Sequence, residues 1–418
     1  MLPGLSYTLD VASVDAFRTS EINGVRRVAR LAVLTGAFLR AAVSSFFFFA
    51  SLNCFFLLPL YIRELGGTEA GIGLIMGAHS AAAIFCQPLV GAWVDQIGRR
   101  PFMLLGAGLV ALSAAAFLGS RSALVFAFLR VLQGIGFSAF FVASYTLIVD
   151  LVPFERRGWA LGIFGLFGLL ATALAPLVGE RVIRSLGYAA FFGLATLLAL
   201  VALALAWQTR EPRRTSLGFR AGLRDILESL GDLFRLPMAL AFTFGLGLGT
   251  IFTFVPTFAD QLGIRNLALF YTGYAGSAML VRMAGGRLSD TLGRRAVIIP
   301  ALLFQSIGVA ILALLDFLLH ARPALPVLLS LSTAGFLAGG AHGFLYPALS
   351  ALLMDQTPEA RRGSAVGIFS SVILTGQAAG AMTFGYVAHK FGYGVMWSVL
   401  TVLLGLGFGA SLRLRAIP

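Results

Sequence analysis

A charged ten-residue turn occurs twice in this hydrophobic sequence, and the two copies decide the fold. The first copy reads GAWVDQIGRR (residues 91–100), and the second reads GRLSDTLGRR (286–295). Five positions match at a constant offset: Gly91, Asp95, Gly98, Arg99 and Arg100 correspond to Gly286, Asp290, Gly293, Arg294 and Arg295. Each copy lies between two long apolar stretches. The chain therefore contains an internal repeat with a polar turn in each half.

Two further polar segments are repeated in the same order. LLPLYIRELGG (57–67) resembles FVPTFADQLGI (254–264), and DLVPFERRGWALGIF (150–164) resembles DQTPEARRGSAVGIF (355–369). The offset is larger for the last pair, which indicates an insertion in the second copy near DFLLHARP (316–323). Chance similarity between apolar helices would not preserve polar loops in one order, so we interpret the chain as a duplication.

The composition is typical of a membrane protein. The 418 residues are 58% hydrophobic and only 12% charged, whereas soluble proteins carry about 25% charged residues. The 49 glycines are spread through the apolar stretches, where small residues let membrane helices pack closely. The apolar runs are too long and too uniform for the short alternating strands of a membrane barrel. We therefore expect an all-α polytopic membrane protein.

Twelve apolar stretches are long enough to cross a bilayer, which takes about 20 residues in a helix. The predicted spans are 41–60, 70–92, 102–120, 124–149, 160–182, 188–207, 237–260, 267–288, 297–319, 324–353, 364–388 and 394–412. A polar segment, 208–236, separates six spans from six. We predict an N-terminal segment (1–40), a six-helix bundle (41–207), a linker that is partly an amphipathic surface helix (208–236), and a second bundle with a short tail (237–418).

The distribution of positive charge predicts the orientation. The chain has 31 Lys and Arg residues, of which Lys390 is the one lysine, and a net charge of +13. These residues gather in alternate loops between the spans, which indicates membrane topology and contact with lipid headgroups, and no nucleic-acid partner. Because positive loops stay in the cytoplasm, both termini and the linker are predicted to be cytoplasmic. We expect a monomer in the bacterial inner membrane.

At this point the motifs resemble a known family. The repeated turn follows the pattern G-x-x-x-D-x-x-G-R-R of the major facilitator superfamily, and RVLQGIGFSAFF (130–141) resembles that superfamily's fourth-span motif. The paired D-x-x-P-x-x-R-R-G turns resemble bacterial efflux permeases for sugars, drugs or metallophores. ATALAPLVGE (171–180) keeps Pro176 and Gly179 of the antiporter signature but has Ala or Glu at three of its glycine positions. The resemblance implies two six-helix repeats that work by alternating access.

The repeated turn is a candidate gate. Arginine alone would set topology, whereas the recurrence of Asp and Gly at fixed spacing indicates a specific contact. The resemblance implies that Asp95 faces the region of Gly363 and Ser364, and that Asp290 faces Gly158, when the cytoplasmic side closes. Glycine at 98 and 293 suits a turn with positive φ. The predicted gate residues are Gly91, Asp95, Gly98, Arg99, Arg100, Asp150, Gly286, Asp290, Gly293, Arg294, Arg295 and Asp355.

Polar residues inside the spans are candidates for substrate or proton contact, because burying them in a bilayer is costly. No Asp or Glu lies deep in a predicted span, so histidine, with a reference pKa of about 6.5, is one candidate proton site; Glu180 and Asp260 near the outer ends are others. A packing role remains the alternative for the histidines and for Arg130. Arg282 aligns with Gln87 and is expected to support the gate. The candidates are Asn53, His79, Arg130, Gln133, Tyr274, His342, Tyr346 and Gln377.

Several function classes find no motif in the chain. The metalloprotease pattern H-E-x-x-H, the hydrolase pattern G-x-S-x-G and the ATP-binding P-loop do not occur, and Cys54 and Cys86 form no metal-ligand pattern. We therefore expect no enzyme, cofactor or metal site. The function predicted is a secondary active transporter for a small organic molecule, with proton-coupled efflux. An importer or facilitator, a lipid flippase and a transporter-like sensor remain alternatives.

Overall fold

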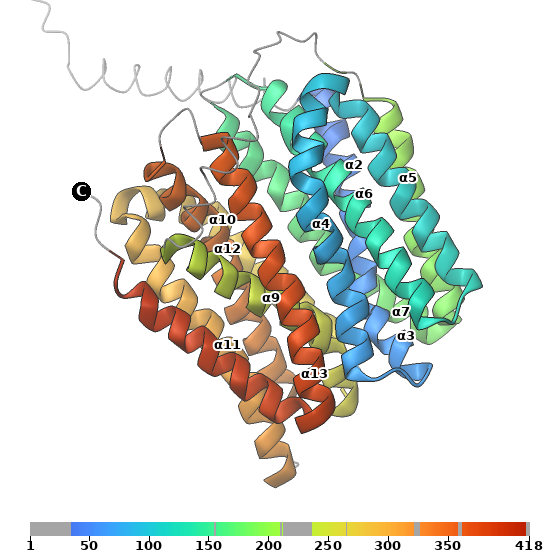
Figure 1. Ribbon diagram of the computed structural model, residues 1–418, viewed down its shortest axis with the longest axis vertical. Coiled ribbons are helices and arrows are strands. Elements are labelled where there is room, and N and C mark those ends of the chain that lie inside the picture. The colour runs from blue at the N-terminus through green and yellow to red at the C-terminus, as the bar shows by residue number, and fades with distance from the viewer. Residues whose placement is uncertain are drawn as a thin grey trace, which may run out of the picture.

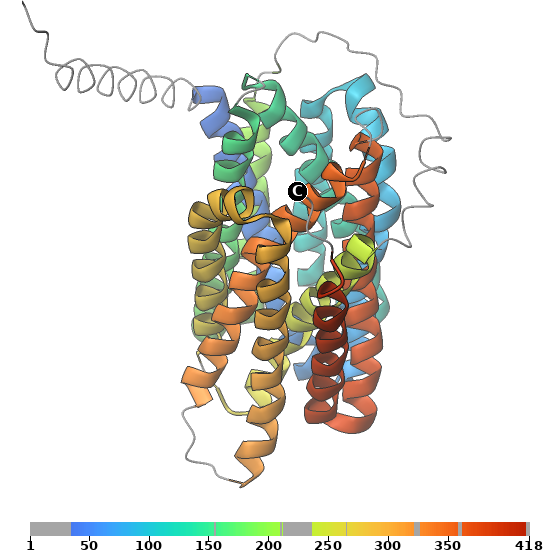
Figure 2. The same ribbon diagram turned by 90° about the vertical axis from the view of Figure 1, so that its left-hand side faces the viewer.

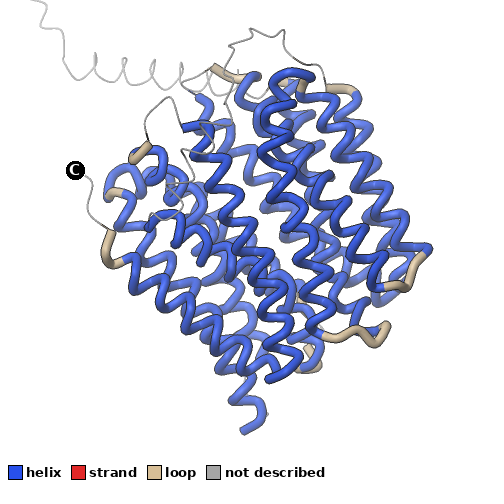
Figure 3. The backbone as a smooth tube through the Cα atoms, viewed as in Figure 1, coloured by secondary structure: helices blue, strands red, loops and turns tan. Residues whose placement is uncertain are grey.

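The computed structural model describes residues 35–153, 156–209, 211, 236–264, 266–321, 327–357 and 362–414. These residues form helices joined by short turns (Figure 3). The predicted segments 1–40 and 208–236 lie almost entirely outside the described residues, and so do the side chains of Asp290, Arg287 and Ser364.

The amino-terminal half, blue to green in Figure 1, is a bundle of long helices. Its elements are α2 (Gly36–Cys54), the 3-10 turn η1 (Phe55–Leu57), α3 (Leu58–Glu64), α4 (Glu69–Ile97), α5 (Arg99–Ala116), η2 (Phe117–Gly119), α6 (Ala123–Asp150) and α7 (Arg157–Trp207). The element α2 continues through η1 into α3, so the predicted span 41–60 is part of one longer helical segment.

The carboxy-terminal half, yellow to red, lies beside the first half (Figures 1 and 2). Its elements are α9 (Leu236–Gln261), α10 (Ala268–Leu292), α11 (Arg294–Ala321), α12 (Val327–Asp355) and α13 (Arg362–Ser411). The main contacts between the halves pair α4 with α13 and α7 with α10. An apolar cluster is continuous between the halves, where the ring of Phe56 stacks on that of Phe252 at 4.5 Å.

Two helices are longer than a single crossing of a bilayer requires. The helix α7 has 51 residues and α13 has 50, and a straight helix of that length would measure about 75 Å against a hydrocarbon core of about 30 Å. Each contains one glycine with non-helical backbone angles: Gly187 (φ 79°, ψ 179°) and Gly392 (φ 82°, ψ 172°). At both places we expected a loop between two spans, and the structure instead turns the chain at a single glycine.

Nine helices among the described residues are long and apolar enough to cross a membrane, counting α7 and α13 once each. The 25-residue α10 is a further long helix outside this set. The protein is thus an all-α polytopic membrane protein, as its composition indicates.

The duplication is visible in the backbone. The described residues with positive φ are all glycines, and they fall into three pairs that the repeat relates: Gly66 with Gly263, Gly98 with Gly293, and Gly187 with Gly392. The φ values of Gly98 and Gly293 are 128° and 85°. A residue with a Cβ is strained in this conformation, and the prediction that Gly98 and Gly293 have positive φ is confirmed.

Candidate functional site: a cavity between the two halves

A cavity of about 240 Å³ lies between the two halves. From the amino-terminal half it is lined by α2, η1, α4, α6 and α7, and from the other half by α9, α10, α12 and α13. The lining is mostly aromatic and aliphatic. Its residues are Ser45, Phe49, Asn53, Phe56, Gln87, Phe137, Phe141, Tyr145, Phe164, Gly165, Gly168, Leu169, Thr172, Leu248, Phe252, Tyr274, Arg282, His342, Tyr346, Ser370, Ile373, Leu374 and Gln377.

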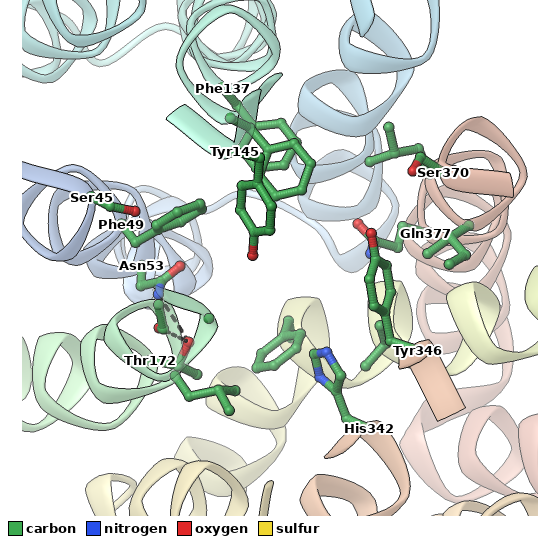
Figure 4. Close-up of a pocket in the computed structure, with 18 of the residues that line it drawn as sticks. Ser45, Phe49, Asn53, Phe137, Tyr145, Thr172, His342, Tyr346, Ser370 and Gln377 are labelled. Atoms are coloured by element: carbon green, nitrogen blue, oxygen red, sulfur yellow. Dashed lines mark hydrogen bonds between the residues drawn. The ribbon is translucent and has the colours of Figure 1, made fainter. Parts of the chain in front are cut away.

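The amino-terminal wall combines phenyl rings with a few polar groups (Figure 4). Asn53 donates a hydrogen bond from Nδ2 to the hydroxyl of Thr172 at 3.0 Å, which fixes the amide between α2 and α7. Figure 4 shows the Tyr145 hydroxyl directed into the cavity, with Phe137 behind it on the same helix. This wall therefore offers neutral hydrogen-bonding groups and no charge.

The opposite wall carries the polar groups of the other half. The Tyr274 hydroxyl and His342 Nδ1 form a close hydrogen bond between α10 and α12, and Tyr346 lies one turn beyond His342 (Figure 4). The hydroxyl of Ser80 on α4 reaches Gln377 Oε1 at 3.4 Å, which links the two halves at the cavity. Of the eight predicted polar candidates, five line the cavity: Asn53, Tyr274, His342, Tyr346 and Gln377.

Among the described residues that line the cavity, Arg282 is the one charged residue. Its guanidinium lies against Gly165 on the facing helix α7, where a Cβ would be 2.7 Å from Nη1 of Arg282 and 3.9 Å from the Tyr145 hydroxyl. Glycine at 165 thus leaves room for the guanidinium. The Nε of Arg282 is buried without a hydrogen-bond partner.

The other three candidates form a separate polar group beside the cavity, between α4 and α6. Arg130, 6% exposed, donates from Nη1 to Gln133 Oε1 at 2.8 Å. His79 packs its ring 5.5 Å from that of Phe137, which does line the cavity. Buried atoms without a partner remain on all three side chains: Arg130 Nε, Gln133 Nε2 and His79 Nδ1. Contact with substrate or protons stays a prediction for these residues.

At one end of the cavity the two halves are in close contact. The backbone of α4 packs on α13 so tightly that a Cβ on Gly73 would collide with the carbonyl oxygen of Ala381. Arg63, at the end of α3, donates to the carbonyl oxygen of Thr257 in the other half at 2.6 Å. Glu69 lies 3.8 Å from Nδ1 of His389. We call this the closed face.

The closed face also contains a helix cap that joins the halves. The Glu180 carboxylate, on α7, accepts hydrogen bonds from the backbone N–H groups of Leu267 at 3.3 Å and Ala268 at 2.9 Å. These are free donors at the start of α10, where a negative charge is favourable. Arg184, one turn further along α7, forms an ion pair with the same carboxylate.

The repeated turns lie at the other end of the molecule, which we call the arginine-rich face. Arg99 lies between two carboxylates, 3.1 Å from Asp95 and 2.9 Å from Asp150. The equivalent pair in the second half is Arg294 with Asp355 at 3.3 Å. The next arginine repeats as well: Arg100 donates to the carbonyl oxygen of Trp207, and Arg295 to that of Leu412, which are equivalent positions.

At the arginine-rich face, described glycines of both halves lie without close neighbours. The same helices that touch at the closed face present glycines with no other part of the chain within 4 Å of a Cβ built there. These are Gly91 on α4, Gly158 and Gly162 on α7, and Gly367 on α13. The Asp95 side chain is 61% exposed, and its ion pair is with Arg99 of its own half. Among the described residues, the close packing between the halves is therefore found at one end of the cavity.

Comparison with known proteins agrees with this architecture. The sequence profile described as Major Facilitator Superfamily matches residues 41–335 and 267–418. The chain belongs to the major facilitator superfamily. It is a multi-pass membrane transporter of that superfamily and not an enzyme.

Curated proteins that this chain resembles include an export protein and a multidrug resistance protein from bacteria. The chain described here is 24% identical over 397 residues to the staphylopine export protein of Staphylococcus aureus, and the match covers 88% of this chain and 93% of the relative. It is 26% identical over 384 residues to the multidrug resistance protein MdtG of Escherichia coli, covering 86% and 90%. Such relatives place the chain in the cell membrane.

Solved structures share the major facilitator fold. A mutant of the nucleoside transporter NupG superposes with a TM-score of 0.75 at 14% identity, covering 90% of this chain and 99% of that one. A bacterial homologue of the lysosomal transporter Spinster, described as inward-facing and unoccupied, gives 0.69 at 17% identity, with 90% and 96% covered. The human organic anion transporter MFSD10 gives 0.64 at 22% identity, with 90% and 100% covered.

Sequence reasoning missed part of this transporter's cavity. Tyr145, Thr172 and Ser370 line it, but hydroxyl residues in a span also bond their own helix and give no distinct signal. Arg282 was identified from the sequence but assigned to support of the gate, although a charge in a span is itself a pointer to a site. The repeat adds a second signal, since its counterpart Gln87 lines the same cavity.

Proposed function

We propose that this major facilitator superfamily member exports a small organic molecule from the cytoplasm by alternating access, coupled to the inward movement of protons. Twelve membrane crossings follow if α7 and α13 each cross twice and α10 crosses once. The arginine-rich face is then cytoplasmic by the positive-inside rule, and both termini lie on that side.

One observation carries the proposal: the cavity is lined by both halves, and among the described residues the close packing between the halves is found at one of its ends. Substrate sites of such transporters lie between the repeats, and rocking one half against the other exposes the site to either side in turn. With the arginine-rich face in the cytoplasm, the structure is an inward-facing state. The Asp95 turn and its repeat are then the surfaces that meet when the cytoplasmic side closes, near Gly363 and Gly158.

The direction of transport is supported by the relatives, two of which are named as an export protein and a multidrug resistance protein. A proton site is supported by His342, which is in the cavity and hydrogen-bonded to Tyr274. A site in the cavity meets each side of the membrane in turn, which a coupling proton requires. Glu180 and Asp260 lie at the closed face instead, where a proton would affect closure.

A second candidate is a facilitator that needs no proton. It is favoured by the described lining of the cavity, which includes no carboxylate and carries its one charged group on Arg282. An anion held there would leave a cell down the membrane potential, which is worth about 2.3 kcal/mol per charge at 100 mV. Such a carrier could export an anion without any coupling ion.

Flux into liposomes tests the proposed function. Purified protein is reconstituted and offered three radiolabelled probes of the same ring size: naphthalene-2-sulfonate, naphthalene-2-sulfonamide and the trimethyl-(2-naphthyl)ammonium cation. We expect saturable flux of at least one probe above protein-free liposomes, and its loss in Asp95→Asn. Flux of none of the three, or flux that survives in both Asp95→Asn and Asp290→Asn, would contradict transport by the proposed gate.

A further inference from the structure

We propose that the cavity binds an organic anion, namely a flat aromatic body with one carboxylate, sulfonate or similar acidic group, and that Arg282 holds the acidic group. The inference rests on the proposed function only in taking this cavity as the substrate site. It names a ligand chemistry that follows from the wall of the cavity.

The charge of the cavity wall favours an anionic ligand. Arg282 contributes one positive charge, and none of the described residues that line the cavity contributes a negative one. Among the described residues no carboxylate lies within 4.0 Å of its guanidinium. A guanidinium cannot release its proton at physiological pH, so the cavity keeps this charge. A cationic ligand would be repelled, whereas an anion would gain an ion pair in surroundings of low dielectric constant.

The guanidinium of Arg282 is also placed where it can bind an acidic group. Arg282 is on α10, and it crosses toward α7, where Gly165 provides space for it beside the Tyr145 hydroxyl. Its Nε is buried and has no hydrogen-bond partner. A planar guanidinium binds carboxylate-like groups through two parallel N–H donors. A ligand oxygen can satisfy this donor, and no acceptor among the described residues does so.

The shape and chemistry of the remaining wall indicate what the uncharged part of the ligand is like. Nine aromatic residues from both halves surround the cavity: Phe49, Phe56, Phe137, Phe141, Tyr145, Phe164, Phe252, Tyr274 and Tyr346. Aromatic faces stack on flat rings and on apolar surface. The neutral polar groups Asn53, Gln87 and Gln377 can orient such a body without adding charge. The volume of about 240 Å³ limits the ligand to a small molecule.

The alternative role of Arg282 is structural support for the gate, as its place three to four residues before the repeated turn suggests. A support role requires a partner that persists. Across the halves its guanidinium lies beside Gly165, which has no side chain that could accept a hydrogen bond. The arginines that do support the turns, Arg99 and Arg294, have carboxylate partners at 2.9 and 3.3 Å. Arg282 differs from both.

Binding measured without any gradient tests the inference separately from transport. Detergent-purified protein is titrated with aryl sulfonates of one, two and three rings and with the uncharged sulfonamide of each. We expect at least one sulfonate to bind about tenfold or more tightly than its sulfonamide, as one hydrogen bond to a charged group contributes. Arg282→Gln should remove this preference and leave sulfonamide binding unchanged, while Arg282→Lys should keep part of it.

The controls separate a local effect from loss of folding or of net charge. Arg121→Gln removes one exposed positive charge far from the cavity and should preserve the preference. Retained sulfonamide binding shows that Arg282→Gln is folded. Equal binding of sulfonate and sulfonamide in the wild type, or a preference that Arg282→Gln keeps and Arg130→Gln loses, would overturn the inference. Flux of the naphthyl cation alone would support the proposed transport function and contradict the proposal of an anionic ligand. Sulfonate binding without flux would support the anionic ligand and contradict the proposed transport function.

Discussion

The Glu180 carboxylate of the amino-terminal half accepts a 2.9 Å hydrogen bond from the backbone N–H of Ala268 in the other half. This contact exists only while the closed face is closed, because it joins α7 to the first turn of α10. A carboxylate at a helix N-terminus contributes about 0.3–1 kcal/mol, and up to about 2 kcal/mol when partly buried. Glu180 is therefore expected to favour the inward-facing state.

Glu180→Gln should weaken closure of that face. Loss of about 1 kcal/mol changes the ratio of the two states about fivefold. The measurement is the rate at which an impermeant thiol reagent, added outside, reacts with a cysteine at Leu248 in the cavity, on a background without Cys54 and Cys86. We expect the rate to rise about fivefold. An unchanged rate would mean that the cap does not contribute to closure.

Asp260→Asn is the matched control for this measurement. Asp260 also forms a contact between the halves at the closed face, with Arg63, but at 3.8 Å and with its side chain 62% exposed. Exposed ion pairs contribute about 0–1 kcal/mol, and most of them contribute little. The labelling rate should therefore remain close to that of the parent protein. If Asp260→Asn had the larger effect of the two, the ion pair and not the helix cap would maintain closure.

The two carboxylates beside Arg99 should have different roles. Asp150 is 34% exposed and its contact lies within one half, so it persists in every state; Asp150→Asn should lower the melting temperature by about 2–4 °C. Asp95 is 61% exposed, so Asp95→Asn should leave stability unchanged while strongly reducing transport and raising cysteine accessibility near Gly363. Thermal unfolding and liposome flux measure the two effects. Equal loss of stability in both variants would assign Asp95 a structural role.

Topology has a direct test by the same labelling chemistry. Cysteines placed at Arg121 and Arg265 should react with impermeant reagent from outside intact cells, and one at Ser216 should not. The expectation comes from the arginine-rich loops, which the positive-inside rule places in the cytoplasm. The opposite pattern would invert the orientation, and the arginine-rich face would then be external.

The features that sequence predicts well here are those read from loops. A polar residue between two apolar spans can be placed in few positions other than the turn, so the repeated Asp, Gly and Arg predict where the turns are. The glycines at 98 and 293 have the positive φ expected of them. The ends of helices were harder to predict. Residues 183–187 read as a loop, but Gly187 alone reverses the chain inside α7, because a single glycine can adopt angles that end one helix and begin another.

The cavity was harder to predict, because inside a bilayer both faces of a helix are apolar and periodicity does not distinguish them. His79 and His342 look alike in sequence, yet His342 lines the cavity and His79 lies beside it against Phe137. The assignment of Arg282 also depends on a partner helix that is more than a hundred residues away in sequence, since Gly165 provides the space for its guanidinium.

Glycines on α4 give a prediction about the whole cycle. Gly73 packs against Ala381 at the closed face, whereas a Cβ on Gly91 would meet nothing within 4 Å at the arginine-rich face. Gly73→Leu should therefore prevent closure of the first face and favour the outward-facing state. Gly91→Leu should be tolerated in the inward-facing state and should block closure of the cytoplasmic side. Both variants should lose flux, and labelling of a cysteine at Leu248 from outside should rise in Gly73→Leu only.

The driving force can be identified from the steady state that the liposomes reach. For a singly charged anion carried alone, a potential of 100 mV gives a concentration ratio of about 50, since it is worth about 2.3 kcal/mol. Exchange of the same anion for one proton moves two charges, so the ratio rises to about the square of that value, and each pH unit adds about tenfold. Naphthalene-2-sulfonate suits this measurement because it stays charged. We expect the ratio to follow the pH gradient in the wild type and to lose that dependence in His342→Gln. A ratio that follows the potential and ignores the pH gradient would instead establish the facilitator.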